Sequence, residues 1–315
     1  MPELYIPPPQ ISFRLKSYST NYVLYSRHSN EPTFDHFGGS IFDDQWWQLI
    51  PGTGKHSGYY LIKSKKTGKV LFSRNSPAPY VGHVGGNGQY DDNYFKLEAG
   101  SGKHANHFRL RNYASDTVIY SRLTRTPNLG NYDAWRTVYD DQYWMFHFED
   151  MEISRITYQI DQGKIIASNT EQLGSETVTN NSSINQTAEF DFSETKTTSS
   201  TFERTHGFTI SAGESGKLEV PFVADYTLKL ELSTTHTFKW GETATESKLY
   251  AARFPATAAP HTKITATATI TRSQIAVPFT IYSKSVSTGY EVATHGTYRG
   301  ITYWNICSDI KETKL

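Results

Sequence analysis

The amino-acid sequence predicts an all-β protein of two parts, an N-terminal β-trefoil followed by an elongated antiparallel β-module. One five-residue motif recurs three times in the first half, and the second half alternates between apolar and polar residues over long stretches. The composition changes between the halves, because residues 1–150 hold 27 of the 44 aromatic residues and the rest is rich in Ser and Thr. We therefore predict domains at 1–150 and 151–315.

The overall composition excludes several classes of protein. The chain of 315 residues carries 31 basic and 31 acidic residues, so we expect no nucleic-acid partner. No apolar run is long enough for a membrane helix, and the first residues do not form a signal-peptide pattern. The one cysteine, Cys307, cannot form an internal disulfide. We expect a soluble protein made in a reducing cytosol without a signal peptide, and we expect no cofactor or metal.

The repeated five-residue motif reads VLYSR, VLFSR and VIYSR, and its copies end at Arg27, Arg74 and Arg122. An Asp-Asp-Gln/Asn motif follows each copy, and similar strand-like segments precede each copy. Each unit therefore predicts two strands around a polar turn, a long loop and an aromatic-rich strand. Three units are too few for a propeller, which needs four to eight blades. Their closure into one barrel gives a β-trefoil of the ricin-B type.

The polar residues of the repeats predict a sugar site in each unit. Sugar hydroxyls both donate and accept, so carboxylates, guanidinium groups and amides suit them, and an aromatic ring covers the apolar face of the sugar. The predicted sets are Arg27, Asp44 and Gln45; Arg74, Tyr80, Asp92 and Asn93; and Arg122, Tyr132, Asp141 and Gln142. Phe34 is a further loop aromatic, and the first set lies beside the most divergent loop.

Two other interpretations of these residues remain. Asp43, Asp91 and Asp140, the first members of the acidic pairs, are equally well explained as ion-pair partners of the arginines that brace the loops. Paired carboxylates also occur in glycosidases. Here the two acids of each pair are adjacent on what we predict to be one strand, so they face opposite ways and cannot flank one bond. We expect no enzyme activity, and we interpret the histidines of HANH, His104–His107, as part of a polar turn.

The second half contains the longest alternation in the chain. The even positions from Leu218 to Leu232 are all apolar, and the odd positions are mostly polar, which predicts one long strand. Lys263–Thr271 alternates as well. A Ser/Thr-rich β-module is either a structural stalk that oligomerises or a source of strands for a membrane barrel. Several chains must then combine, because one hairpin cannot close a barrel.

The trefoil motifs, FEDMEISRI (Phe148–Ile156), the Ser/Thr tract, KLEVPF, KWGE and STGYEV…GTYRG (Ser287–Gly300) resemble the fungal haemolytic lectins of the Laetiporus sulphureus type. In that family a β-trefoil is fused to an aerolysin-like pore-forming module. The resemblance implies binding of galactose-type glycans, lactose or N-acetyllactosamine. It also implies a ring homo-oligomer on the target membrane and an inserting hairpin near residues 195–216. On its lipid face we place Phe202, Phe208, Ile210 and Ala212, although Lys196, Arg204 and His206 share that parity.

The sequence thus predicts a haemolytic, pore-forming lectin that acts on cell-surface galactosides and target-cell membranes. The alternative is a non-lytic multivalent agglutinin whose second domain only oligomerises.

Overall fold

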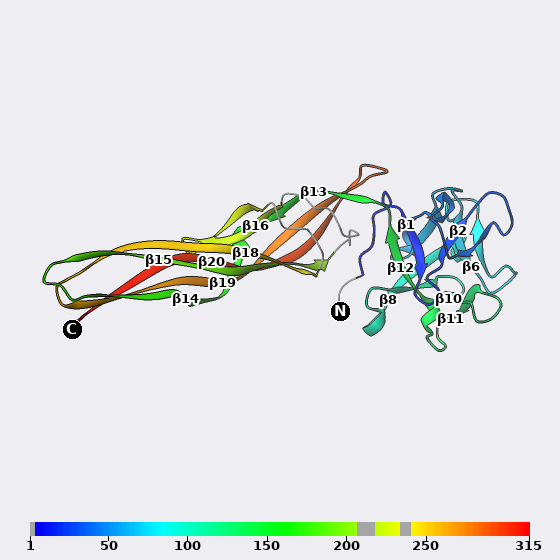
Figure 1. Cartoon of the computed structure of the whole chain (residues 1–315). Coiled ribbons are helices and arrows are strands. Elements are labelled where there is room, and N and C mark those ends of the chain that lie inside the picture. The colour runs from blue at the N-terminus through cyan, green and yellow to red at the C-terminus, as the bar shows by residue number, and fades with distance from the viewer. Residues whose placement is uncertain (1–3, 207–217, 234–240) are drawn as a thin grey trace. The chain divides into compact units, whose positions relative to one another are not determined.

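The computed structural model describes residues 4–206, 218–233 and 241–315. The chain forms two compact units. The first contains Met1–Glu152 and Ser283–Val292, and the second contains Ile153–Tyr282 and Ala293–Leu315. In the described residues every long element is a strand, which confirms the all-β prediction (Figure 1).

The first unit holds a 12-stranded sheet in which each repeat contributes four strands. The strands of the first repeat are β1 (Phe13–Ser17), β2 (Val23–Ser26), β3 (Phe34–Phe37) and β4 (Trp47–Pro51). Those of the second are β5 (Tyr60–Ser64), β6 (Val70–Ser73), β7 (Val81–Val84) and β8 (Tyr94–Ala99). Those of the third are β9 (Phe108–Asn112), β10 (Thr117–Ser121), β11 (Leu129–Asp133) and β12 (Tyr143–Phe148).

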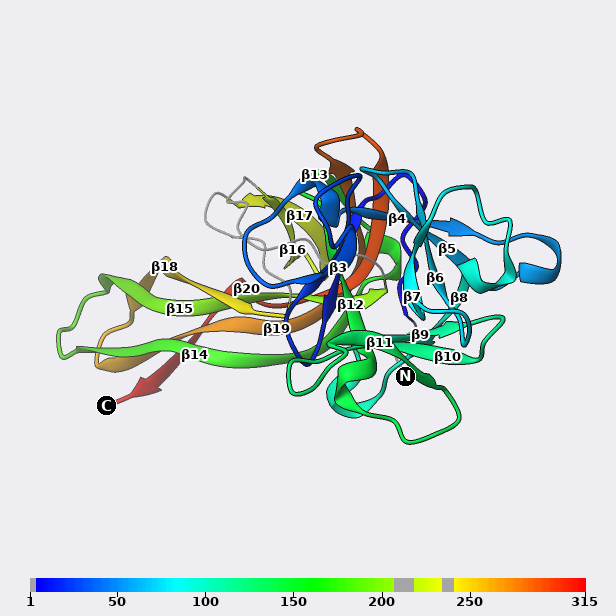
Figure 2. The same cartoon turned by 90° about the vertical axis from the view of Figure 1, so that its right-hand side faces the viewer.

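Six of these strands close a barrel. β1 pairs with β4, β4 with β5, β5 with β8, β8 with β9, β9 with β12, and β12 returns to β1. The other six strands form the hairpins β2–β3, β6–β7 and β10–β11, one from each repeat (Figure 2). A closed six-stranded barrel with three hairpins is a β-trefoil, as the repeats predict.

The apolar residues of the repeats fill the barrel. The fully buried core takes equivalent residues from all three units: Leu15, Ile62 and Leu110; Leu24, Leu71 and Ile119; Trp47, Phe95 and Trp144. The two buried indole groups donate to strand carbonyls, from Trp47 to Leu24 and from Trp144 to Ile119, each at 3.0 Å. Each bond satisfies a polar group that would be costly to bury alone.

The second unit is an antiparallel sheet of long strands. They are β13 (Met151–Tyr158), β14 (Lys164–Asn180), β15 (Gln186–His206), β18 (Thr243–Ala258), β19 (Thr262–Ser285) and β20 (Glu291–Lys314). The sheet order is β13-β19-β20-β15-β18, with β14 on β19 (Figure 1). The predicted strand at Lys263–Thr271 lies within β19. In the described part of the chain, no helix has the length and hydropathy of a membrane span.

The prediction of one strand through residues 217–232 is wrong. The chain turns back at Asp225 and Tyr226 and forms the hairpin of β16 (Leu218–Ala224) and β17 (Thr227–Ser233), a two-stranded sheet of its own. Both turn residues have positive φ angles, 49° and 61°, as a two-residue turn of type I′ requires. Alternation specifies strands but does not show where a strand ends, and Asp is the one turn-forming residue here.

Candidate functional site

The arginine of each five-residue motif stacks on the aromatic ring of the residue two positions before it. The guanidinium carbon is 3.9 Å from the ring centroid for Arg27 on Tyr25 and 3.8 Å for Arg74 on Phe72. For Arg122 on Tyr120 the distance is 4.0 Å. Alternate residues share one side of an extended chain, so the side chain folds back over the ring in a cation–π contact. This stacking fixes the position of each guanidinium group.

The second aspartate of the acidic pair approaches the arginine in two repeats. Arg27 Nε lies 3.2 Å from Asp44, and Arg74 Nε lies 3.4 Å from Asp92, in both cases without the geometry of a hydrogen bond. In the third repeat, Arg122 donates instead to the carbonyl of Pro127 and the hydroxyl of Tyr120.

The second aspartates are also partly desolvated. Burial raises the pKa of Asp92 and of Asp141, and the nearby arginines Arg74 and Arg122 partly offset this rise. In the first repeat, Asp44 Oδ1 is buried and has no hydrogen-bond partner in the described part of the chain. A buried carboxylate oxygen without a donor is a position where a ligand hydroxyl group can bind.

The acidic pairs do not lie on strands, so that expectation is wrong. They form the short 3-10 helices Asp43–Gln45, Asp91–Asn93 and Asp140–Gln142. Each helix is closed by a backbone bond to the preceding aromatic residue, as from Gln45 to Phe42 at 3.2 Å. The two acids of each pair still face different groups.

The first aspartates of repeats two and three bind a Lys–His pair from the turn that opens their repeat. His56 Nε2 donates to Asp91 at 3.0 Å, and His104 Nε2 donates to Asp140 at 3.0 Å. Lys55 and Lys103 bind the same carboxylates. The hydrogen bonds from these lysines lower the pKa of Asp91 and of Asp140, and the histidines lower them further.

The first aspartate therefore forms structural ion pairs in these two repeats. Its partners are a lysine and a histidine, not an arginine. The sequence signal for these partners is the recurrence of Gly-Lys-His at 54–56 and 102–104. His104 of HANH belongs to this brace. Within the described residues, no group of three or more His, Cys, Asp or Glu side chains could hold a metal ion.

The predicted amide contacts, Gln45, Asn93 and Gln142, are buried. The Gln45 and Gln142 amides donate to loop carbonyls of Ser40 and Thr137, at 3.1 and 3.2 Å. Asn93 donates to Asp92 Oδ1 at 2.9 Å. In this structure the amides fix the loop and, in the second repeat, the orientation of the carboxylate.

The aromatic residues of the loops differ in exposure. Tyr80 is 51% exposed, Tyr132 is partly buried beside Tyr139, and Phe34 packs against the barrel core. The exposed aromatics that recur in every repeat are the residues directly before the acidic pairs: Phe42, Tyr90 and Tyr139, with 51%, 54% and 48% exposure. They are not among the predicted site residues, although the sequence signal is present, because an aromatic residue precedes every acidic pair.

A second missed set connects the repeats to one another. The serine of each five-residue motif forms a hydrogen bond with a side chain of another repeat. The pairs are Ser26 with His83, Ser121 with His36, and Ser73 with Asn131, at 2.7, 2.7 and 2.9 Å. These three partners occupy equivalent positions opposite the second strand of each repeat. Burial, with a smaller contribution from Lys69, lowers the pKa of His83 to about 4.

The residues predicted for membrane insertion are only partly described. Phe202 is buried in β15, and its ring contacts Phe279 and Tyr298 with centroid distances of 5.4 and 5.3 Å. Lys196 of the same strand binds Glu171 and Glu194. The other three residues, Phe208, Ile210 and Ala212, lie outside the described residues.

Several solved structures are similar to this chain or to part of it. The BEL β-trefoil is 45% identical, with 45% of this chain and 96% of that chain covered and a TM-score of 0.43. The lamprey immune protein is 14% identical, with 96% and 90% covered and a TM-score of 0.41. The aerolysin-like protein of Bombina maxima is 16% identical, with 51% and 98% covered and a TM-score of 0.36. No curated protein matches the chain.

A family model describes most of the second half. The model of Clostridium epsilon toxin ETX and Bacillus mosquitocidal toxin MTX2 matches residues 129–312, more than half of the chain. The protein joins an N-terminal β-trefoil to an antiparallel module of aerolysin type. The chain therefore belongs to the ETX/MTX2 toxin family.

Proposed function

We propose that this protein is a non-enzymatic, pore-forming lectin of the Laetiporus type. Residues 1–150 bind galactose-type glycans, such as lactose or N-acetyllactosamine, on the target cell. Residues 151–315 assemble into a ring and insert a β-barrel into the target membrane. The partners are thus a cell-surface galactoside, the membrane and further copies of the chain.

One observation supports the glycan site above the others. Each repeat places three groups in order along the chain. They are an arginine stacked on an aromatic ring, an exposed aromatic residue, and the second aspartate of the acidic pair, which is partly buried. Together they offer donors, an acceptor and an apolar surface to a sugar. We assign glycan contact to Arg27, Phe42 and Asp44; Arg74, Tyr80, Tyr90 and Asp92; and Arg122, Tyr132, Tyr139 and Asp141. Gln45 and Gln142 hold their loops, and Asn93 orients the Asp92 carboxylate.

Three weak sites on one chain suit a glycan-coated surface. A shallow sugar site typically binds in the millimolar to micromolar range, about −4 to −8 kcal/mol. Simultaneous contact through several sites raises the effective affinity by orders of magnitude.

The register of β15 with β18 supports membrane insertion. These strands pair from Gln186 with Ala258 to Thr201 with Thr243, so even-numbered residues face even-numbered residues. If this parity continues, one face of the hairpin collects the even positions of the intervening chain. In the sequence these are mostly apolar, including Phe208, Ile210, Ala212 and every even position from 218 to 232. The odd positions are mainly Ser, Thr, Lys, Glu and Gly, which suit a wet lumen.

The folded hairpin β16–β17 has the other parity. Val220 faces Glu231 and Phe222 faces Lys229, so each face mixes apolar and charged residues. Tyr226 at its turn packs on Trp304 of β20, with centroids 4.5 Å apart. We propose that β16–β17 is the storage form of the inserting hairpin, which extends beyond the predicted residues 195–216. Any change of register by an odd number of residues moves every side chain of one strand to the other face. The change from the pairing of β16 with β17 to a continuation of the pairing of β15 with β18 is seven residues, and it creates the lipid-facing surface.

Leakage from red cells, measured with and without lactose, tests the proposal. We expect the purified protein to release haemoglobin and lactose to inhibit the release. The double substitution Asp92→Ala and Asp141→Ala is expected to reduce agglutination and leakage together. Agglutination without leakage would instead identify a non-lytic agglutinin, and release of free sugar would identify an enzyme.

A further inference from the structure

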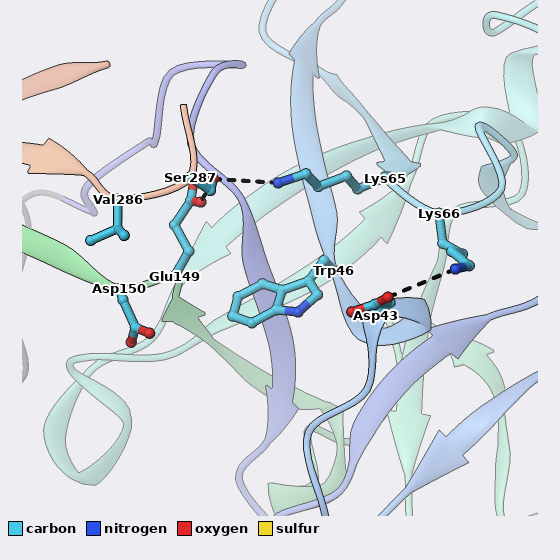
Figure 3. Close-up of a pocket in the computed structure, with 8 residues that line it drawn as sticks. All are labelled: Asp43, Trp46, Lys65, Lys66, Glu149, Asp150, Val286 and Ser287. Atoms are coloured by element: carbon cyan, nitrogen blue, oxygen red, sulfur yellow. Dashed lines mark hydrogen bonds and ion pairs between the residues drawn. The ribbon is translucent and has the colours of Figure 1, made fainter. Parts of the chain in front are cut away.

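A pocket of about 490 Å³ lies in the first unit, and none of the residues assigned to glycan contact lines it. Its walls are Asp43, Trp46, Lys65, Lys66, Glu149, Asp150, Val286 and Ser287, and all eight residues belong to that unit (Figure 3). Figure 3 shows the indole of Trp46 between Asp43 on one side and Glu149 and Asp150 on the other. The volume is within the range of about 300–1,000 Å³ that is typical of small-molecule sites.

The pocket lies where the threefold symmetry is broken. Trp46, Tyr94 and Tyr143 occupy the same position, directly after their 3-10 helices. His56 stacks on Tyr94 with centroids 3.6 Å apart, and His104 stacks on Tyr143 at 3.9 Å. The first repeat has no Gly-Lys-His turn, because Pro7, Pro8 and Pro9 occupy the corresponding positions. No aromatic ring of the described residues stacks on Trp46.

The first aspartate of this repeat is likewise left without the cations that its equivalents have. Asp91 and Asp140 each bind a lysine and a histidine. Among the described residues, Asp43 pairs only with Lys66, at 3.8 Å, and 87% of the Asp43 side chain is exposed. Arg14 is 5.6 Å from the Trp46 ring centroid, farther than either stacked histidine from its ring. Repeats two and three thus show what this arrangement of ring and carboxylate binds, which is a basic nitrogen group.

The remaining charged groups of the pocket include both carboxylates and ammonium groups. Glu149 is buried and already accepts hydrogen bonds from the Ser12 backbone and the Ser287 hydroxyl. Two carboxylates, Asp43 and Asp150, and two ammonium groups, Lys65 and Lys66, remain. Lys65 has a long bond of 3.4 Å to Ser287. A ligand that carries one positive and one negative group can therefore find an oppositely charged partner for each of them.

We propose that the pocket binds a small zwitterion with an organic ammonium group and a phosphate, of phosphocholine chemistry. The ammonium group lies against Trp46, near Asp43 and Asp150, as quaternary ammonium ligands bind to aromatic rings. The phosphate lies between Lys65 and Lys66, since lysine is a common point-charge ligand for phosphate. The proposal does not depend on galactoside binding, because it uses none of the groups assigned to the glycan.

Titration of the full-length protein with free phosphocholine, by calorimetry and tryptophan fluorescence, tests this site. We expect saturable binding that Trp46→Leu and Asp43→Asn each weaken about tenfold or more. The matched control is Asp91→Asn, which changes the equivalent acid in a repeat whose cation position is already filled. It is expected to leave phosphocholine binding unchanged. Lactose binding should be the same in all three variants.

Further titrations of the same protein use choline, inorganic phosphate and phosphatidylcholine vesicles. Choline and phosphate should each bind more weakly than phosphocholine, and vesicle binding that Asp43→Asn reduces would identify a lipid headgroup as the source. Binding to free phosphocholine alone would identify a soluble source. The proposal is overturned if phosphocholine does not saturate the wild type, or if Asp43→Asn and Asp91→Asn have equal effects. Choline binding as tight as phosphocholine would overturn the role of the lysines.

Discussion

A disulfide across β16–β17 is expected to block pore formation without affecting glycan binding. The change is Val220→Cys with Glu231→Cys, in a chain where Cys307, which is exposed, is replaced by Ser. The two residues face each other in the hairpin. Facing residues of antiparallel strands have Cα atoms about 4.5–5.5 Å apart, which lies within the range of about 4.4–6.8 Å for disulfides.

The two registers place Val220 and Glu231 at very different separations. If the pairing of β15 with β18 continues, Glu231 lies opposite Gly213, which is seven residues from Val220 along the strand. At about 3.3 Å per residue the two positions are then about 23 Å apart. Moreover, every register that pairs even with even residues places these two side chains on opposite faces. The disulfide and the inserted form exclude each other.

The assay is haemoglobin release by the oxidised and the reduced variant, with agglutination measured in parallel. Oxidation should abolish release and dithiothreitol should restore it, while agglutination stays constant. The matched control is Thr197→Cys with Ser247→Cys, a facing pair of β15 and β18 whose register is the same in both forms. This control should lyse cells in either redox state. Equal lysis by the oxidised and reduced β16–β17 variant would refute the register change.

Three further predictions concern the trefoil. His83→Asn should flatten the pH dependence of stability, because a pKa of about 4 means that the folded state disfavours the charged ring. Wild-type stability should therefore be full above about pH 6.5 and fall toward pH 4, by about 1–3 kcal/mol after allowance for solvent screening, in urea unfolding. Asn131 already fills the equivalent position, and an unchanged pH slope would contradict this cause. Tyr90→Ala should weaken lactose binding by calorimetry about two- to tenfold, since one ring contact contributes about 0.5–1.5 kcal/mol; unchanged affinity would remove this ring from the site. His104→Ala should lower the melting temperature by several degrees through loss of its contacts with Tyr143 and Asp140, about 1–3 kcal/mol, with lactose affinity unchanged.

The trefoil was predictable because its core repeats in the sequence. Trp47, Phe95 and Trp144 recur at the spacing of the units, and three copies of one strand pattern leave few ways to close a barrel. The local structure of the acidic pairs was not predictable in the same way. Their 3-10 turns depend on buried amides such as Gln45 that bind loop carbonyls, and periodicity does not reveal such bonds.

The candidate site was predicted in part for a related reason. The arginines and second aspartates stand out because their chemistry repeats, and the structure places Arg27 near Asp44 and Arg74 near Asp92. The partners of the first aspartates lie far away in the chain, as His56 does from Asp91. A single sequence does not show that two residues 35 positions apart, as His56 and Asp91 are, come into contact.

The alternation from Leu218 to Leu232 gives information that the folded hairpin does not use. A hairpin with a two-residue turn pairs even with odd positions, so one apolar face requires the alternation to change phase at the turn. Here the phase continues through Asp225 and Tyr226, and consequently Val220 faces Glu231. The same phase agrees with the pairing of β15 and β18, in which even positions meet. A pattern that conflicts with the folded hairpin but agrees with its flanking strands is expected for a segment that has to form one amphipathic hairpin in a second state.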